Sequence, residues 1–125
     1  VLDGIADAVV GTAVTKAALP IAVAFLRGVL CNFLVCLAVW MAFCARSAGG
    51  KMVSLFGPIF LFVLCGFEHS VANMYYSPAG IFLAGNGELS WRDLLRNLLP
   101  VTLGNLVGGC ALGGILYLLY ARKAG

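Results

Sequence analysis

Long apolar runs separated by short polar segments are the main pattern of this chain. Residues 21–45 and 98–121 are almost continuously apolar, and residues 52–84 are apolar except where Glu68-His69-Ser70 interrupts them. A helix needs about 20 mostly apolar residues to cross a bilayer. The pattern therefore predicts an all-α membrane protein with three transmembrane segments.

The middle segment does not fit a single straight span. As one helix, residues 52–84 would reach roughly 50 Å, whereas the hydrocarbon core is about 30 Å thick. Non-helical backbone at membrane depth is tolerated only where protein or a water-filled cavity covers it. We therefore expect this segment to be broken near its polar triplet.

Two polar segments flank the predicted spans. Residues 1–19 are mixed, with Asp3 and Asp7 on one helical face, and we expect short helices at the membrane surface. Residues 85–97 form a polar loop in which Ser90 and Asp93 predict a capping box at the start of a short amphipathic helix.

The composition indicates that lipid, and not water, surrounds most of this chain. The chain is 62% hydrophobic and 10% charged, with a mean hydropathy of +1.04. Soluble domains are about a quarter charged, so the lipid bilayer is the expected surrounding. The net charge of +3 is scattered and forms no basic stripe, which argues against nucleic-acid binding.

The charges also predict an orientation. Arg46 and Lys51 flank a Ser-Ala-Gly-Gly turn, and such a basic loop faces the cytoplasm. The charges of residues 85–97 cancel, which places that loop outside. Arg122 and Lys123 then place the C-terminus in the cytoplasm, as expected for a multi-pass protein of the inner (plasma) membrane.

Small residues in the apolar runs predict packing rather than chemistry. None of the five cysteines forms a C-x-x-C pair, so neither a disulfide scaffold nor a metal site is expected. Gly104-x-x-x-Gly108 and Gly109-x-x-x-Gly113 predict faces for close helix packing.

His69 and Glu68 are the strongest candidates for function. His69 is the only histidine and lies within an apolar stretch, where polar groups tend to mark pathways, although a packing role is the alternative. Glu68 would either serve as a structural acceptor, for the imidazole or for freed backbone groups, or tune the histidine tautomer. We favour the structural role, because a carboxylate facing a pore would repel anions.

Three further polar side chains are candidates for a role. Asn32 and Lys16 each have two possible roles, and Arg27 has one. Asn32 predicts either a hydrogen bond between helices or a contact that holds the broken segment. Lys16 is either a solvated surface lysine or a charge that draws anions into an outer vestibule. Arg27 is expected to snorkel to the interface.

Three stretches of this chain resemble one family. Gly66–Met74, Arg27–Ala38 and Asn97–Asn105 are similar to the central, fourth-helix and sixth-helix signatures of the formate/nitrite transporter family. The resemblance implies helices four to six, the C-terminal half of an aquaporin-like channel with two inverted repeats. It also implies a pentamer that passes small monovalent anions of weak acids, formate first, with nitrite and hydrosulfide as alternatives.

The resemblance further implies a set of pathway residues and no cofactor or enzymatic activity. His69 would be the central pore histidine that assists protonation or hydrogen bonding. The other residues of the implied pathway are Glu68 beside it, Asn32 bonded near that pair, Lys16 in the outer vestibule, Phe62 at an outer hydrophobic constriction, and Val35 lining the pore. Helices one to three have no counterpart here, so we expect the chain to be either part of a longer protein or a non-conducting remnant.

The competing interpretation is a membrane anchor subunit of a redox complex, without transport activity. His69 would then be a cofactor ligand. A haem usually takes a second axial ligand, and the chain has no other histidine.

Overall fold

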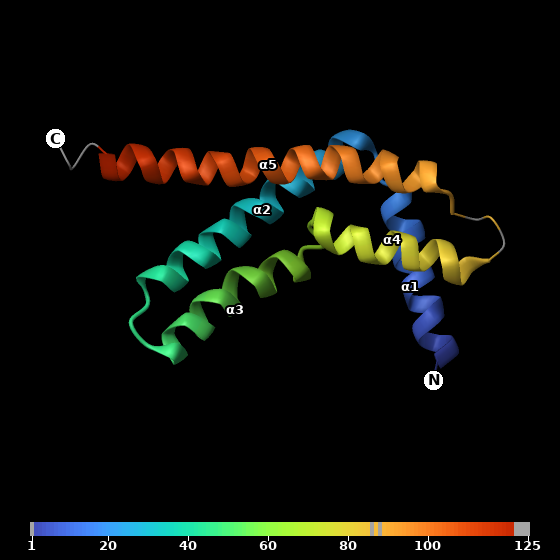
Figure 1. The fold of residues 1–125 in the computed structure, drawn as a ribbon, viewed down its shortest axis with the longest axis horizontal. Helices are drawn as coiled ribbons and strands as arrows, with labels where there is room; N and C mark the ends of the chain where they lie inside the picture. The colour runs from blue at the N-terminus through green and yellow to red at the C-terminus, as the bar shows by residue number, and fades with distance from the viewer. Residues whose placement is uncertain (1, 86, 88, 122–125) are drawn as a thin grey trace.

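The computed structural model describes residues 2–85, 87 and 89–121 (Figure 1). These residues confirm the all-α class. They form five helices: α1 (Leu2–Ala17), α2 (Ile21–Cys44), α3 (Ala48–Leu64), α4 (Ser70–Ala84) and α5 (Trp91–Ala121). Two of them, α2 and α5, are long and apolar enough to cross a membrane, whereas α3 is a shorter apolar helix. The predicted role of Arg122 and Lys123 lies outside the described residues.

Glycines hold α2 and α5 close together, as the sequence predicts. A Cβ atom added at Gly104 would clash with the backbone carbonyl of Phe25, and one at Gly108 would clash with that of Val29. Only residues without a side chain allow the two backbones to approach this closely. On the second predicted face, a Cβ atom added at Gly109 would clash with the side chain of Asn32, whereas one at Gly113 would meet no atom of the described residues within 4 Å.

The interruption expected in residues 52–84 is present. Helix α3 ends at Leu64 and α4 begins at Ser70. Between them, Gly66 turns the chain with a left-handed φ of 63°, which a residue without a side chain adopts readily. The amide of Glu68 donates to the carbonyl of Arg27 at 3.4 Å, so α2 supports the backbone of the break.

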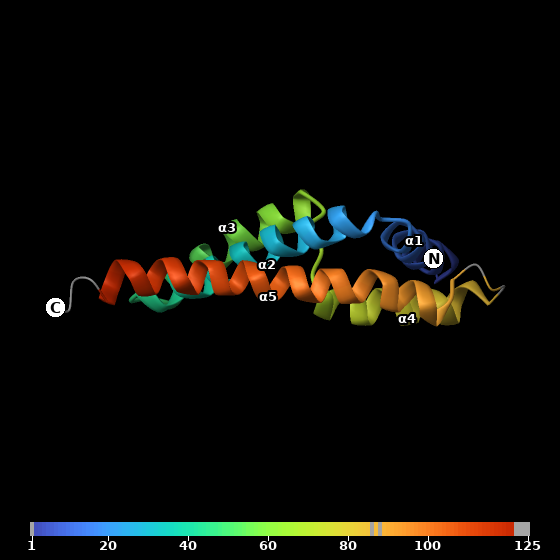
Figure 2. The same ribbon diagram turned by 90° about the horizontal axis from the view of Figure 1, so that it is seen from above.

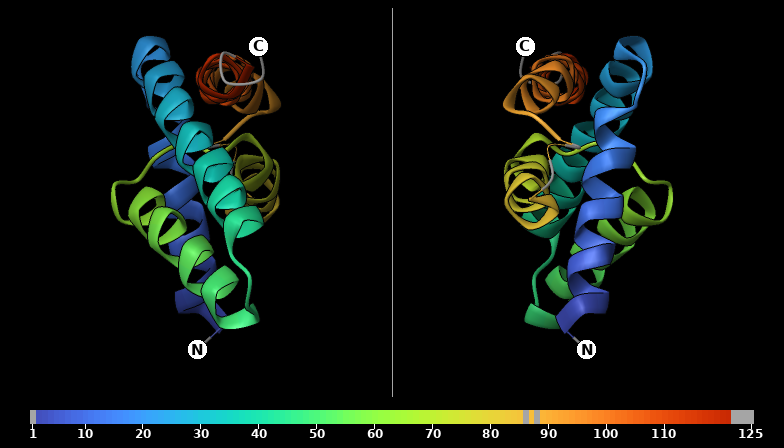
Figure 3. Two further views of the ribbon diagram at one scale, coloured as in Figure 1. Left: turned by 90° about the vertical axis from the view of Figure 1, so that its left-hand side faces the viewer. Right: turned by 90° about the vertical axis from the view of Figure 1, so that its right-hand side faces the viewer.

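Helix α1 lies across the bundle rather than along it. It is one continuous helix, so the expectation of several short helices is wrong. It packs against α4, where Gly80 leaves room for the buried Ala13. Figure 2 shows α1 and α4 near one end of α5. Figure 3 looks along α5 and shows α1 from the side, so the axis of α1 runs across that of α5.

Two predicted element boundaries are also wrong. Ser47 caps α3 by accepting from the amide of Gly50 at 3.1 Å, so the supposed turn at residues 47–50 is the first turn of a helix. The capping box at Ser90 is confirmed, because the amide of Ser90 donates to Asp93 Oδ2 at 3.0 Å and the amide of Asp93 donates to Ser90 Oγ at 3.4 Å. The helix that it opens does not stop, however, and runs through Pro100 as the single helix α5.

Candidate functional site

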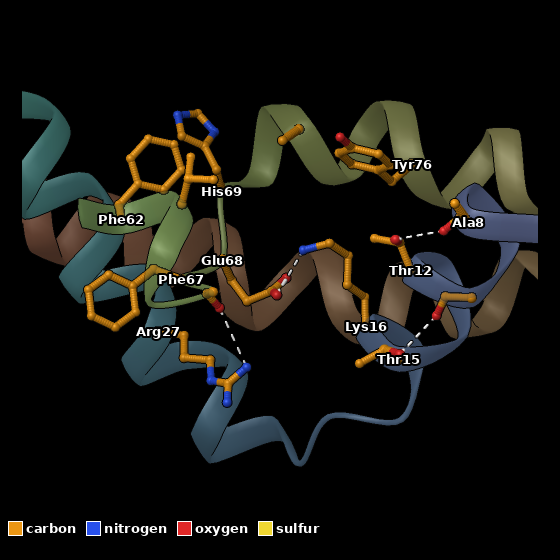
Figure 4. Close-up of a pocket in the computed structure, with 14 residues that line it drawn as sticks. Ala8, Thr12, Thr15, Lys16, Arg27, Phe62, Phe67, Glu68, His69 and Tyr76 are labelled. Atoms are coloured by element: carbon orange, nitrogen blue, oxygen red, sulfur yellow. Dashed lines mark hydrogen bonds and ion pairs between the residues drawn. The ribbon is translucent and has the colours of Figure 1, made fainter. Parts of the chain in front are cut away.

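A pocket of about 770 Å³ opens beside the helix break (Figure 4). Four helices and the break contribute to its wall. The lining residues are Ala8, Gly11, Thr12, Thr15 and Lys16 of α1, Arg27 of α2, Phe62 and Val63 of α3, Gly66, Phe67, Glu68 and His69 of the break, and Ala72 and Tyr76 of α4.

His69 is placed by its role at the start of α4. It is the N-cap residue, and its Nδ1 accepts a hydrogen bond from the amide of Val71 at 3.2 Å. An accepting Nδ1 carries no proton, so the neutral ring carries its proton on Nε2 and can donate from there. The ring centroid lies 6.1 Å from that of Phe62. The imidazole therefore meets the pocket as a hydrogen-bond donor beside an aromatic wall.

Glu68 points away from its neighbour His69. Its side chain is 3% exposed, and it accepts from Lys16 Nζ at 2.8 Å and from Asn73 Nδ2 at 2.6 Å. Figure 4 shows the carboxylate directed at Lys16, with the imidazole on another side of the break. Glu68 is thus a structural acceptor, but the expected bond to the histidine ring is wrong.

These contacts close into a ring of four residues, which we call the amide ring. Asn73 Nδ2 also donates to Asn97 Oδ1 at 2.8 Å, and Asn97 Nδ2 donates to the backbone carbonyl of Lys16 at 2.9 Å. Because a backbone carbonyl can only accept, Asn97 must turn its Nδ2 toward Lys16 and its Oδ1 toward Asn73. Asn73 must then donate to Asn97 from its own Nδ2. Glu68 therefore receives donors from both sides, an arrangement that suits its carboxylate form.

Asn105 of α5 holds the break itself. Its Oδ1 accepts from the amide of Ser70 at 2.9 Å, and its Nδ2 donates to the carbonyls of Gly28 at 2.9 Å and Glu68 at 3.0 Å. Asn32 donates to the backbone carbonyl of Asn105 at 2.6 Å. Asn32 thus makes a hydrogen bond between helices, and it reaches the break only through Asn105, which bonds the carbonyl of Glu68.

Sequence reasoning missed the three asparagines Asn73, Asn97 and Asn105. All three are buried, with exposed fractions of 0%, 4% and 7%. A signal was available, because each one lies within one of the three family-like stretches and a buried amide needs hydrogen-bond partners. Which partners it finds depends on the tertiary arrangement.

The pocket contains two cations. Lys16 is 15% exposed and ion-paired, so the solvated surface lysine is wrong. Arg27 lines the pocket and donates from its guanidinium to the carbonyl of Gly66 at 3.5 Å, in an exposed contact. The pocket brings together Lys16, Phe62, Glu68 and His69, whereas Asn32 and Val35 of α2 are not among its lining residues.

Two apolar helices of membrane-spanning length, a helix break and a pocket at that break are the arrangement expected of a helical membrane protein. The sequence matches the formate/nitrite transporter family over residues 2–119. The chain belongs to this family, which consists of channels and transporters rather than enzymes.

Individual relatives agree. The chain is 52% identical over 95 residues to a probable formate transporter of Methanothermobacter thermautotrophicus, covering 75% of this chain and 34% of the relative. It is 38% identical over 114 residues to the formate channel FocA of Escherichia coli K12, covering 77% of this chain and 40% of that protein. Among solved structures, it matches a pentameric formate channel with formate bound, with a TM-score of 0.85 and 37% identity, over 91% of this chain and 51% of that one. The chain thus spans between a third and about half of these proteins.

Proposed function

We propose that this chain is the C-terminal half, helices four to six, of a channel or transporter for small monovalent anions of weak acids. Formate is the first candidate permeant, with nitrite and hydrosulfide next. The support is the family, the formate named for its relatives, and one observation above all. The break between α3 and α4 presents a donating imidazole to a pocket whose neighbouring carboxylate is already neutralised.

The proposed membrane arrangement has three spans, over residues 21–45, 52–84 and 98–121. The middle span would consist of α3 and α4, joined at the break, and residues 1–19 would lie at the outer surface. The crossing of α1 over α4 supports this, because a helix at the interface runs across the spanning helices (Figure 3). The whole protein would be an inverted-repeat pentamer in the inner membrane, with a cytoplasmic C-terminus.

The proposed mechanism uses the cost of dehydrating an anion. Moving from water toward the apolar wall at Phe62 disfavours the charged form of the permeant and raises its proton affinity. His69 Nε2–H donates a hydrogen bond to the permeant anion. The anion takes its proton from water, either directly or through His69, which water then reprotonates, and the neutral acid passes the apolar wall. Glu68 does not repel the anion, because Lys16 and Asn73 already occupy its carboxylate.

The roles of four further residues are proposed from the family resemblance. Val35 would line the pore further along α2. Lys16 would be the basic residue of the outer vestibule, and Phe62 would form the outer hydrophobic constriction. Asn32 would act indirectly, by holding Asn105 of α5 against α2.

The test is formate flux into liposomes, measured across pH for the full-length protein that carries this chain. His69→Asn is the sharp variant. Asparagine is a good N-cap residue and can replace the bond to the amide of Val71, whereas His69→Ala removes the cap together with the ring. We expect His69→Asn to lower formate flux at least tenfold and to change its dependence on pH, without loss of assembled protein.

Equal flux for the wild type and the His69→Asn variant at every pH would remove the imidazole from the mechanism. His69→Ala serves as the comparison for the cap. If only His69→Ala loses flux, His69 acts by starting α4 rather than by donating to a permeant.

A further inference from the structure

Arg27 is a pocket cation whose charge is not offset by a carboxylate among the described residues. Lys16 lies 2.8 Å from Glu68, so these two charges cancel. Among the described residues, the guanidinium of Arg27 makes one hydrogen bond, to the carbonyl of Gly66 at 3.5 Å, which is longer than an ordinary N–H···O bond of about 2.7–3.2 Å. The described charges of the lining therefore sum to one positive charge, and that charge belongs to Arg27.

The surroundings of Arg27 leave room for a ligand. Gly66, whose carbonyl accepts from the guanidinium, has open space where a side chain would begin, since no atom of the described residues lies within 4 Å of an added Cβ. Figure 4 shows Arg27 and His69 at opposite edges of the pocket, with the pair formed by Lys16 and Glu68 between them. An anion bound at Arg27 would thus be in the same pocket as the imidazole without touching it.

We propose that Arg27 recruits the permeant and that its ligands are planar monovalent oxyanions. The inference rests on the proposed function, because it assigns a step of anion transport to this residue. It assigns the recruitment of the anion to Arg27 instead of Lys16, because the charge of Lys16 is paired with Glu68. A net positive pocket with apolar walls concentrates anions from solution.

The shape of the guanidinium sets the preferred ligand class. Its N–H groups form a planar fork that matches two oxygens of one carboxylate, and the same geometry fits the two oxygens of nitrite. Hydrosulfide has a single sulfur atom and cannot engage both arms of the fork through two acceptors. Arg27 therefore favours formate and nitrite over hydrosulfide at the recruiting step.

The test measures formate flux against formate concentration, in liposomes containing the full-length protein. For Arg27→Gln, we expect the half-saturating formate concentration to rise about tenfold, the factor expected from one charge-assisted hydrogen bond. The maximal flux should stay within about twofold, because the imidazole is untouched. Arg27→Lys keeps the charge but loses the fork, and we expect a rise of about threefold.

Arg46→Gln is the matched control, since it removes the same charge from an exposed loop residue outside the pocket. Its half-saturating concentration should not change. A second measurement uses nitrite and hydrosulfide as inhibitors of formate flux. Arg27→Lys should weaken inhibition by nitrite about as much as it weakens formate, and should leave inhibition by hydrosulfide unchanged.

The outcomes separate this inference from its basis. Wild-type protein without formate flux would overturn the proposed function and the inference together. Wild-type flux with the same half-saturating concentration in Arg27→Gln would overturn the inference alone, as would an equal rise in Arg46→Gln. Misfolding is recognised separately, because it lowers the maximal flux rather than raising the concentration needed for half of it.

Discussion

Lys16 Nζ lies 2.8 Å from Glu68 Oε1, joining the end of α1 to the break between α3 and α4. The carboxylate is 3% exposed and the lysine side chain 15%. Through Asn73 and Asn97 the same contact continues back to the carbonyl of Lys16. One ion pair therefore belongs to a ring that ties α1, the break, α4 and α5 together.

Removing one partner of this ion pair should be far more destabilising than removing the charge of both. Lys16→Met leaves a buried carboxylate without its counter-ion, and breaking a buried pair in this way costs about 3–5 kcal/mol. The double variant Lys16→Met/Glu68→Gln removes the uncompensated charge and should recover most of that loss. The measurement is the free energy of unfolding in detergent.

Lys51→Met is the control for a lost cation, because Lys51 is exposed at the start of α3. It should change stability by no more than about 0.5 kcal/mol. Equal losses for Lys16→Met and the double variant would show that the pair is not an energetic unit in the folded protein.

Asn105 should be the most sensitive of the asparagines around the break. Asn105→Leu keeps the approximate size but leaves the amide of Ser70 and the carbonyls of Gly28 and Glu68 without this partner. Each buried group left unpaired costs about 1–3 kcal/mol, so a loss of roughly 3 kcal/mol or more is expected. Asn32→Leu removes one bond and should cost about 1–2 kcal/mol. The measurement is the free energy of unfolding of the two variants in the same detergent. An equal loss for both would contradict the central role of Asn105.

The helix break was predictable because its cause is local. Glu68, His69 and Ser70 are three polar residues in a segment too long for one straight span, and both features can be read from the sequence without knowing the partner helices. The orientation of each side chain was not predictable. Glu68 and His69 are adjacent in sequence, yet one turns to Lys16 and the other caps α4.

The features that the sequence did not predict depend on tertiary contacts. Arg27 was expected at the interface because long cations usually reach water, and its contact with Gly66 was not predictable because it arises where α2 passes beside the break. Residues 91–97 were expected as a separate helix because their polarity changes before Pro100, yet helical hydrogen bonding continues through them. Pro100 lies inside α5, where it removes one backbone donor, and the helix nevertheless continues on both sides of it.

The glycines of α5 should respond very differently to the same substitution. Gly104→Ala would place a methyl group against the carbonyl of Phe25, forcing α2 and α5 apart at a cost of about 1–3 kcal/mol or more. Gly113 has nothing within 4 Å of an added Cβ. Within this chain, Gly113→Ala should be neutral or stabilise the helix by up to about 1 kcal/mol. Thermal unfolding of both variants measures the contrast, and similar shifts would argue against close contact of the two helices.

The orientation predicted from the charges can be tested by chemical labelling. In a background without the five native cysteines, Arg46→Cys lies in the short connection between α2 and α3, and Arg92→Cys lies in the first turn of α5. If basic loops remain in the cytoplasm, a membrane-impermeant maleimide added to intact cells should label the Arg92→Cys variant directly. The Arg46→Cys variant should react only after the membrane is opened. Both positions are exposed, so access to the thiol is limited by the membrane and not by packing. The reverse order of labelling would invert the membrane arrangement. Labelling of both variants in intact cells would mean that residues 52–84, which lie between the two positions, do not cross the membrane as proposed.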